Sequence, residues 1–110
     1  MKDQWYINYY QLQALRTAVY PEEYKMIYPA LGLAGEAGEV ADKVKKIIRD
    51  GRTDWEYQRE IALELGDVLW YIASLADDMG YTLQEIAAMN LRKLRKRAEE
   101  NKIQGEGDNR

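Results

Sequence analysis

Helix-breaking proline is confined to the first third of this 110-residue chain, and this feature limits its fold most. The two prolines are Pro21 and Pro29, and after the second one apolar residues recur every three or four positions. A proline-free segment with that spacing forms amphipathic helices, whereas a strand needs alternation. The sequence therefore predicts an all-α protein.

Turn and capping residues divide the chain into four expected helices. Asp3 can cap the first helix, and Pro21 ends its apolar pattern. Gly51 stands where a left-handed residue commonly ends a helix. Asp54 can cap the next helix, and residues 82–85, with Thr first and Glu last, have the order of a capping box. We expect helices at about residues 4–18, 30–50, 54–80 and 82–101, in one domain of residues 1–102 followed by an arm at 103–110.

The second and third expected helices carry one apolar pattern, displaced by 28 residues. In each helix five apolar residues follow at spacings of four, three, four and three, which places them in a single stripe. They are Leu33, Ala37, Val40, Val44 and Ile47, and then Ile61, Leu65, Val68, Ile72 and Leu75. The repeated stripe predicts that the two helices pack against each other in an antiparallel pair.

Acidic residues follow the same shift, because Glu36 corresponds to Glu64 and Glu39 corresponds to Asp67. Each pair lies on the same flank of its stripe, so antiparallel packing would make four carboxylates converge. Such carboxylates repel one another, and their pKa values rise unless a cation lies among them. The pattern therefore predicts a site for Mg²⁺ or Mn²⁺, which prefer oxygen ligands. Ordinary solvated helix faces are the alternative for either pair taken alone.

Four glycines lie inside these two helices, and each costs about 1 kcal/mol relative to alanine. They are Gly32, Gly35, Gly38 and Gly66. That cost favours a specific role, which is either close approach of the helices or entry of a ligand beside the carboxylates.

The composition excludes several chemistries. The chain has no Cys and no His, so disulfides, thiolate or imidazole metal sites and Ser-His-Asp arrangements are ruled out. The net charge of −3 argues against a general nucleic-acid binder. No apolar run approaches the roughly 18 residues that cross a bilayer, and no signal-type segment follows the N-terminus. We therefore expect a cytoplasmic protein with neither a membrane nor a nucleic acid as partner.

In its carboxylate pattern and over most of its length, the chain resembles the MazG-like nucleoside triphosphate pyrophosphohydrolases of the all-α NTP pyrophosphatase group. The family motif is E-E-x-x-E, a spacer, and E-x-x-D. It appears here as GEAGE at residues 35–39, a spacer of 24 residues, and ELGD at residues 64–67. The stretches YPALGLAGEAGEVADKVKK and ELGDVLWYIA and the ending GEGDNR are similar to small stand-alone members. Gly35 replaces the first Glu of the motif, which leaves the number of metal ions open.

The resemblance implies an oligomeric, antiparallel four-helix bundle and a reaction. Family members hydrolyse NTPs or dNTPs between the α and β phosphates with Mg²⁺, releasing the monophosphate and pyrophosphate. Carried over residue by residue, Glu36, Glu39, Glu64 and Asp67 are the metal ligands, with Mn²⁺ as a substitute for Mg²⁺. Either Glu36 or Glu39 would be the catalytic general base, and the motif does not decide between them.

Five further residues are expected at the substrate. Asn90, Lys93 and Arg97 share one face of the last helix and match the N-x-x-K-x-x-x-R pattern whose side chains contact phosphates in this family. Lys43, one turn past the E-x-x-E pair, is a weaker phosphate candidate. Tyr71, its counterpart under the 28-residue shift, is expected either to stack on a base or to pack at the edge of the core.

The aromatic content predicts association between chains. Nine Tyr and three Trp are more than a small helical domain can bury, and both types are enriched at interfaces. Tyr20, Tyr24 and Tyr28 form one cluster of these residues. We expect a homo-oligomer, either a dimer or a tetramer, as the resemblance also implies.

Three other functions remain open on the sequence alone. In a helical adaptor the same acidic residues would be ordinary surface residues. A nucleic-acid-associated protein would use the basic run at residues 92–97. A hydrolase of the same fold could act on another pyrophosphate, such as a phosphoribosyl nucleotide or an alarmone.

Overall fold

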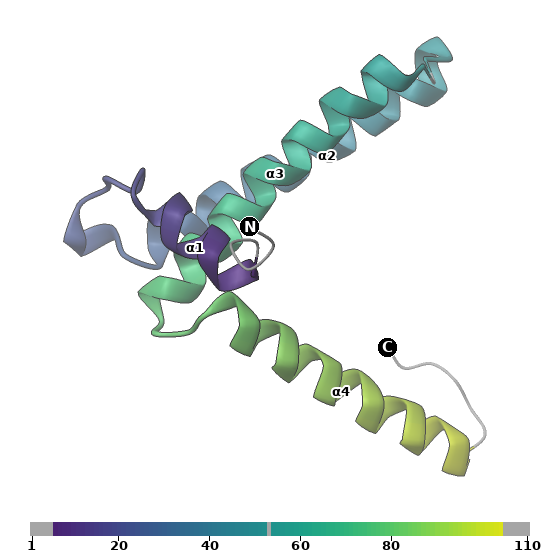
Figure 1. Ribbon diagram of the computed structural model, residues 1–110. Coiled ribbons are helices and arrows are strands. Elements are labelled where there is room, and N and C mark those ends of the chain that lie inside the picture. The colour runs from purple at the N-terminus through teal and green to yellow at the C-terminus, as the bar shows by residue number, and fades with distance from the viewer. Residues whose placement is uncertain (1–5, 53, 105–110) are drawn as a thin grey trace.

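The computed structural model describes residues 6–52 and 54–104, with side chains as far as Asn101. This part of the chain is helical and contains no strand, which confirms the all-α prediction (Figure 1). The elements are α1 (Ile7–Leu15), the short 3₁₀ helix η2 (Glu22–Tyr24), α2 (Ile27–Asp50), α3 (Trp55–Asp78) and α4 (Leu83–Gln104).

Three of the predicted helix ends are confirmed in detail. Gly51 ends α2 in the left-handed conformation, at φ 69°. The Asp54 carboxylate caps α3 by accepting a 2.8 Å hydrogen bond from the amide of Tyr57. At the start of α4 the Thr82 hydroxyl accepts from the Glu85 amide at 3.1 Å, and the Glu85 carboxylate accepts from the Thr82 amide at 2.9 Å. These ends are specified by residues close in sequence.

Other helix bounds differ from the expected ones. The start of α2 lies at Ile27, before the expected residue 30, because Pro29 occupies the first turn, where an amide has no partner within the helix. The first helix ends at Leu15 rather than 18, and α4 continues to Gln104. The proposed cap Asp3 lies outside the described residues, and α1 begins after Tyr6 without a side-chain cap.

The helices form two diverging arms (Figure 1). One arm is the antiparallel pair of α2 and α3, so the predicted pairing is confirmed. Not all of the stripe is covered by that pairing, because Ala37, Val44 and Leu65 are exposed in a single chain. The other arm is α4, which leaves the base of the hairpin where α1 contacts both α3 and α4. The four expected helices are therefore present, but within one chain α4 does not lie alongside α2 and α3.

Side chains of α1 fix the point at which the arms separate. Buried Gln11 donates from Nε2 to the carbonyls of Ala73, at 3.1 Å, and Tyr81, at 3.2 Å. Its Oε1 accepts from the amide of Leu83 at 3.0 Å, so one amide joins three elements. The adjacent Gln84 amide donates to Oδ1 of Asn8 at 2.9 Å. Two of the first amides of α4 are thus satisfied by α1, which sets the direction of α4.

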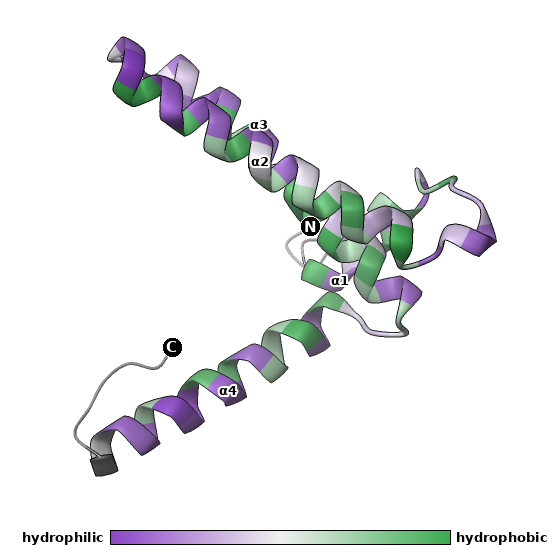
Figure 2. Cartoon of the chain, turned by 180° about the vertical axis from the view of Figure 1, so that it is seen from behind, coloured by the Kyte–Doolittle hydropathy of each residue, from purple (hydrophilic) through white to green (hydrophobic). Residues whose placement is uncertain are grey.

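The core of one chain is small and lies at this junction. Ala73, Ala76 and Leu83 are buried there, and Tyr10, Ile72 and Ile86 pack against them. Large apolar side chains remain exposed on both arms, and several are more than half exposed. They include Leu31, Ile48, Leu63 and Leu65 on the hairpin and Leu91 and Leu94 on α4. Figure 2 shows hydrophobic residues along both arms. A single chain therefore leaves extensive apolar surface uncovered.

None of the helices in the described ranges is both long enough and apolar enough to cross a membrane.

Candidate functional site

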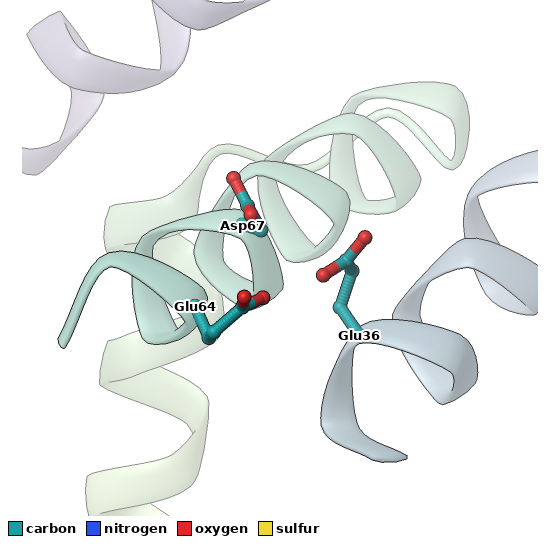
Figure 3. Close-up of side chains that lie close together, drawn as sticks. All are labelled: Glu36, Glu64 and Asp67. Carbon is teal, nitrogen blue, oxygen red and sulfur yellow. The ribbon is translucent and has the colours of Figure 1, made fainter. Parts of the chain in front are cut away.

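Three carboxylates converge between α2 and α3. Glu36 projects from α2 towards Glu64 and Asp67 of α3 (Figure 3). Each residue offers an oxygen, and these oxygens all lie within 4.8 Å of one another. The spacing of three residues between Glu64 and Asp67 places both on one face of α3, and the antiparallel packing brings Glu36 to that face.

Within this carboxylate group, Glu36 has a raised pKa. Loss of hydration raises the pKa of Glu36, and the negative charges of Asp67 and Glu64 raise it further. A hydrogen bond with Glu64 and the charge of Glu39 act in the same direction. The ionised form of Glu36 is therefore disfavoured unless a positive charge lies among the carboxylates.

Glu39 has a different position from the other predicted ligands. It is exposed and lies outside the group of converging oxygens, although its charge reaches Glu36. The structure thus brings together three of the four acids that the sequence pattern predicts as one group.

The donor set of the carboxylate group suits a hard divalent cation. Three carboxylates supply oxygen ligands of the kind that Mg²⁺ and Mn²⁺ take, and no Cys or His is present to favour a softer metal. A cation among these oxygens would remove the repulsion that raises the pKa of Glu36.

Tyr71 lies next to the carboxylate group. Its pKa is raised mainly by burial, then by a hydrogen bond with Tyr28, and also by the charges of Glu36 and Asp67. The ring covers Gly32 of α2 so closely that a Cβ at that glycine would lie 2.2 Å from Cε1 of Tyr71. The predicted substrate residue Tyr71 is therefore at the site, held between α2 and α3.

Close helix approach explains only one of the four helical glycines. A Cβ added at Gly35, Gly38 or Gly66 would meet no described atom within 4 Å. At these three positions the glycine leaves open space rather than allowing contact within the chain.

The predicted phosphate contacts are not gathered at the carboxylates within one chain. Nζ of Lys43 lies 3.7 Å from Oε1 of Glu60 across the hairpin, so this lysine already has an acidic neighbour. Asn90, Lys93 and Arg97 lie on α4, the other arm of the molecule (Figure 1). Asn90 and Lys93 line a small cavity of about 260 Å³ on that arm.

Residues 28–101 match the family model of the MazG nucleotide pyrophosphohydrolase domain. The chain is 42% identical to the Gene 37 protein of Mycobacterium phage L5, and the alignment covers 96% of this chain and 99% of the phage protein. No solved structure matches the chain.

The matched segment contains α3 and nearly all of α2 and α4, and with them the carboxylate group and every other residue predicted at the site. The all-α architecture and the spacing of the acids agree with that match. This chain therefore belongs to the MazG nucleotide pyrophosphohydrolase domain family.

Proposed function

We propose that the protein is a Mg²⁺-dependent hydrolase that cleaves NTPs or dNTPs between the α and β phosphates. The products are the nucleoside monophosphate and pyrophosphate. The observation that carries this proposal is the convergence of Glu36, Glu64 and Asp67 within 4.8 Å in a chain of the nucleotide pyrophosphohydrolase family. Removal of surplus or noncanonical dNTPs from the cytoplasm is the biological role that fits this reaction.

The three converging carboxylates hold Mg²⁺, with Mn²⁺ as a substitute. When bound, the cation neutralises phosphate charge and lowers the pKa of water. Glu39 lies outside the converging oxygens, so it is available to accept the proton of the attacking water and is our preferred general base. Glu36 is the alternative general base if it turns away from the cation. Glu39 acts as a fourth ligand if it turns towards Glu36.

The remaining substrate contacts are assigned to Tyr71 and to basic residues. Lys43 reaches a phosphate if it leaves Glu60, which is 3.7 Å away. Asn90, Lys93 and Arg97 contact the phosphates from a second copy of the chain, since α4 carries them away from the carboxylate group of their own chain. The protein is accordingly a homo-oligomer, a dimer or a tetramer, and the exposed apolar residues of both arms support this assembly.

The proposal is tested by measuring monophosphate and pyrophosphate release from a panel of NTPs and dNTPs, in Mg²⁺ and in EDTA. Glu64→Gln and Asp67→Asn remove ligand charge with little change in shape and should abolish turnover. Glu56→Gln is the matched control, because this exposed acid lies in the first turn of α3, two turns before Glu64.

Other outcomes separate the alternatives. If no nucleotide is hydrolysed but Mg²⁺ raises the melting temperature, the protein binds the metal and its substrate is a different pyrophosphate compound. If no nucleotide is hydrolysed and Mg²⁺ leaves the melting temperature unchanged, the carboxylates are ordinary surface residues and the protein is an adaptor.

A further inference from the structure

An aromatic cavity of about 410 Å³ lies between α3 and the segment that joins α1 to α2. Its walls include Tyr20, Tyr24, Tyr28 and Trp70, together with Thr17 and Pro21. The proposed chemistry at the carboxylates uses none of these residues. A volume of this size lies within the range of small-molecule sites, which are mostly apolar and aromatic.

A series of aromatic contacts connects the cavity to the carboxylate group. The rings of Tyr20 and Tyr28 stack with centroids 5.0 Å apart and an interplanar angle of 28°. Tyr28 contacts Tyr71, with centroids 6.3 Å apart. Tyr71 lies one turn after Asp67 on α3 and covers Gly32, which is one turn before Glu36 on α2. The rings of Trp70 and Tyr71 contact edge to face, with centroids 4.9 Å apart. A nucleotide whose phosphates lie at the carboxylates thus has an aromatic cavity next to it.

Polar groups around the cavity are used in hydrogen bonds within the chain. Nε1 of Trp70 donates to Oγ1 of Thr17 at 2.8 Å and to the carbonyl of Ala14 at 3.1 Å. The Thr17 hydroxyl itself donates to that carbonyl at 2.8 Å. The Tyr20 hydroxyl donates to Oδ2 of Asp78 at 2.8 Å. These bonds hold the rings of Trp70 and Tyr20 in place and use their polar atoms within the chain, so a ligand meets mainly the apolar surface of these side chains.

We propose that this aromatic cavity binds the nucleobase of the substrate by stacking, mainly on Tyr24, Tyr28 and Trp70. The inference rests on the proposed function and adds a specificity to it. Every base has a π-face, and stacking discriminates weakly among bases, whereas hydrogen bonds to base edges discriminate strongly. The enzyme therefore accepts both purine and pyrimidine nucleotides, and the larger purines have the lower KM.

The first test removes one ring from the cavity. Tyr24 is 48% exposed, so Tyr24→Leu can be made without disturbing the core. It should raise the KM for dATP about tenfold, the effect of losing one stacking contact, and leave kcat unchanged. Tyr24→Phe retains the ring and should restore the low KM, and Tyr6→Leu, which removes an exposed ring at the start of α1, is the matched control.

Inorganic tripolyphosphate separates base binding from phosphate binding. Its inhibition constant should be the same for the wild type and Tyr24→Leu, because it carries no base. An equal weakening of dATP and tripolyphosphate, or an unchanged KM for dATP, would overturn the assignment of the cavity.

A binding measurement in EDTA tests the cavity independently of turnover. Adenosine and thymidine should shift the indole N–H signal of Trp70 in a ¹H–¹⁵N spectrum, and ribose 5-phosphate should not. The signal of Trp55, at the start of α3, serves as the internal control. Shifts of Trp70 in a protein that hydrolyses no nucleotide would support the cavity and refute the proposed reaction. No shift of Trp70 with either nucleoside would refute the cavity.

Discussion

Glu36 is the residue on which the carboxylate group depends most, because it is the member supplied by α2. Its pKa is raised above the ordinary value of 4.5, first by loss of hydration and then by the charges of Asp67 and Glu64. A carboxyl group with a raised pKa binds more protons in the folded state than in the unfolded state. Its contribution to stability is therefore complete at low pH and is lost as pH rises through the folded pKa.

The raised pKa of Glu36 predicts how metal binding depends on pH. The increase in melting temperature that Mg²⁺ produces should be small at pH 5 and larger at pH 8, because protons compete with the cation for Glu36. Thermal unfolding of the wild type in Mg²⁺ and in EDTA across this range measures the effect. Glu36→Gln should reduce the increase at pH 8. An increase that is equal at pH 5 and pH 8 would contradict the role given to Glu36.

Two glycines of α2 should respond in opposite ways to alanine. Gly32→Ala places a Cβ 2.2 Å from the ring of Tyr71, so the ring must move, and the free energy of unfolding should fall by about 1–3 kcal/mol. Gly38→Ala meets no described atom within 4 Å and should raise the free energy of unfolding by up to about 1 kcal/mol. Urea unfolding measures both variants, and equal effects would contradict the close approach at Gly32.

At the scale of elements, the predictable features are those set by neighbouring residues. The cap Asp54, the capping box at 82–85 and the helix end at Gly51 were all predictable, because their bonds join residues within four positions. The repeated stripe also predicted the α2–α3 pair and, with it, the meeting of Glu36 with Glu64 and Asp67.

The direction of α4 could not be predicted, since it depends on side chains far away in sequence. Gln11 binds the Leu83 amide across 72 positions, and a polar residue in α1 gives no local sign of such a bond. Likewise, the separation of Glu39 from the converging oxygens depends on side-chain placement, which helical spacing does not determine.

Gln11 should therefore be the most sensitive polar residue of α1. Gln11→Ala leaves the buried Leu83 amide without its acceptor and should lower the free energy of unfolding by about 1–3 kcal/mol. Gln13→Ala, two positions along the same helix and less buried, is the matched control. Hydrogen exchange at the start of α4 should accelerate in Gln11→Ala. Equal stability of the two variants would show that Gln11 does not fix α4.

At the scale of the whole molecule, we propose that a second copy of the chain covers the two arms. The small core at the junction contrasts with the apolar side chains exposed along both arms. Light scattering should give the mass of two or four chains of 12.9 kDa, and the melting temperature should rise with protein concentration. A stable monomer at micromolar concentration would contradict the proposed assembly.

Mixing two inactive variants tests whether α4 acts on a second chain. Asp67→Asn lacks a carboxylate, and the double variant Lys93→Ala/Arg97→Ala lacks the basic face of α4. If the sites are shared between chains, unfolding and refolding an equal mixture restores about a quarter of the wild-type activity in a dimer, because half of the dimers contain one intact site. No recovery from a mixture that has re-assembled would place the phosphate contacts within one chain.

The reaction proposed for this protein is water attack on the α-phosphorus of a nucleotide held at Glu36, Glu64 and Asp67. The most direct test is ³¹P NMR of dATP hydrolysis in H₂¹⁸O with Mg²⁺, comparing the wild type with Glu64→Gln. We predict equal amounts of monophosphate and pyrophosphate, with ¹⁸O only in the monophosphate, and no products from Glu64→Gln. Release of orthophosphate, ¹⁸O in the pyrophosphate, or full activity of Glu64→Gln would contradict this reaction.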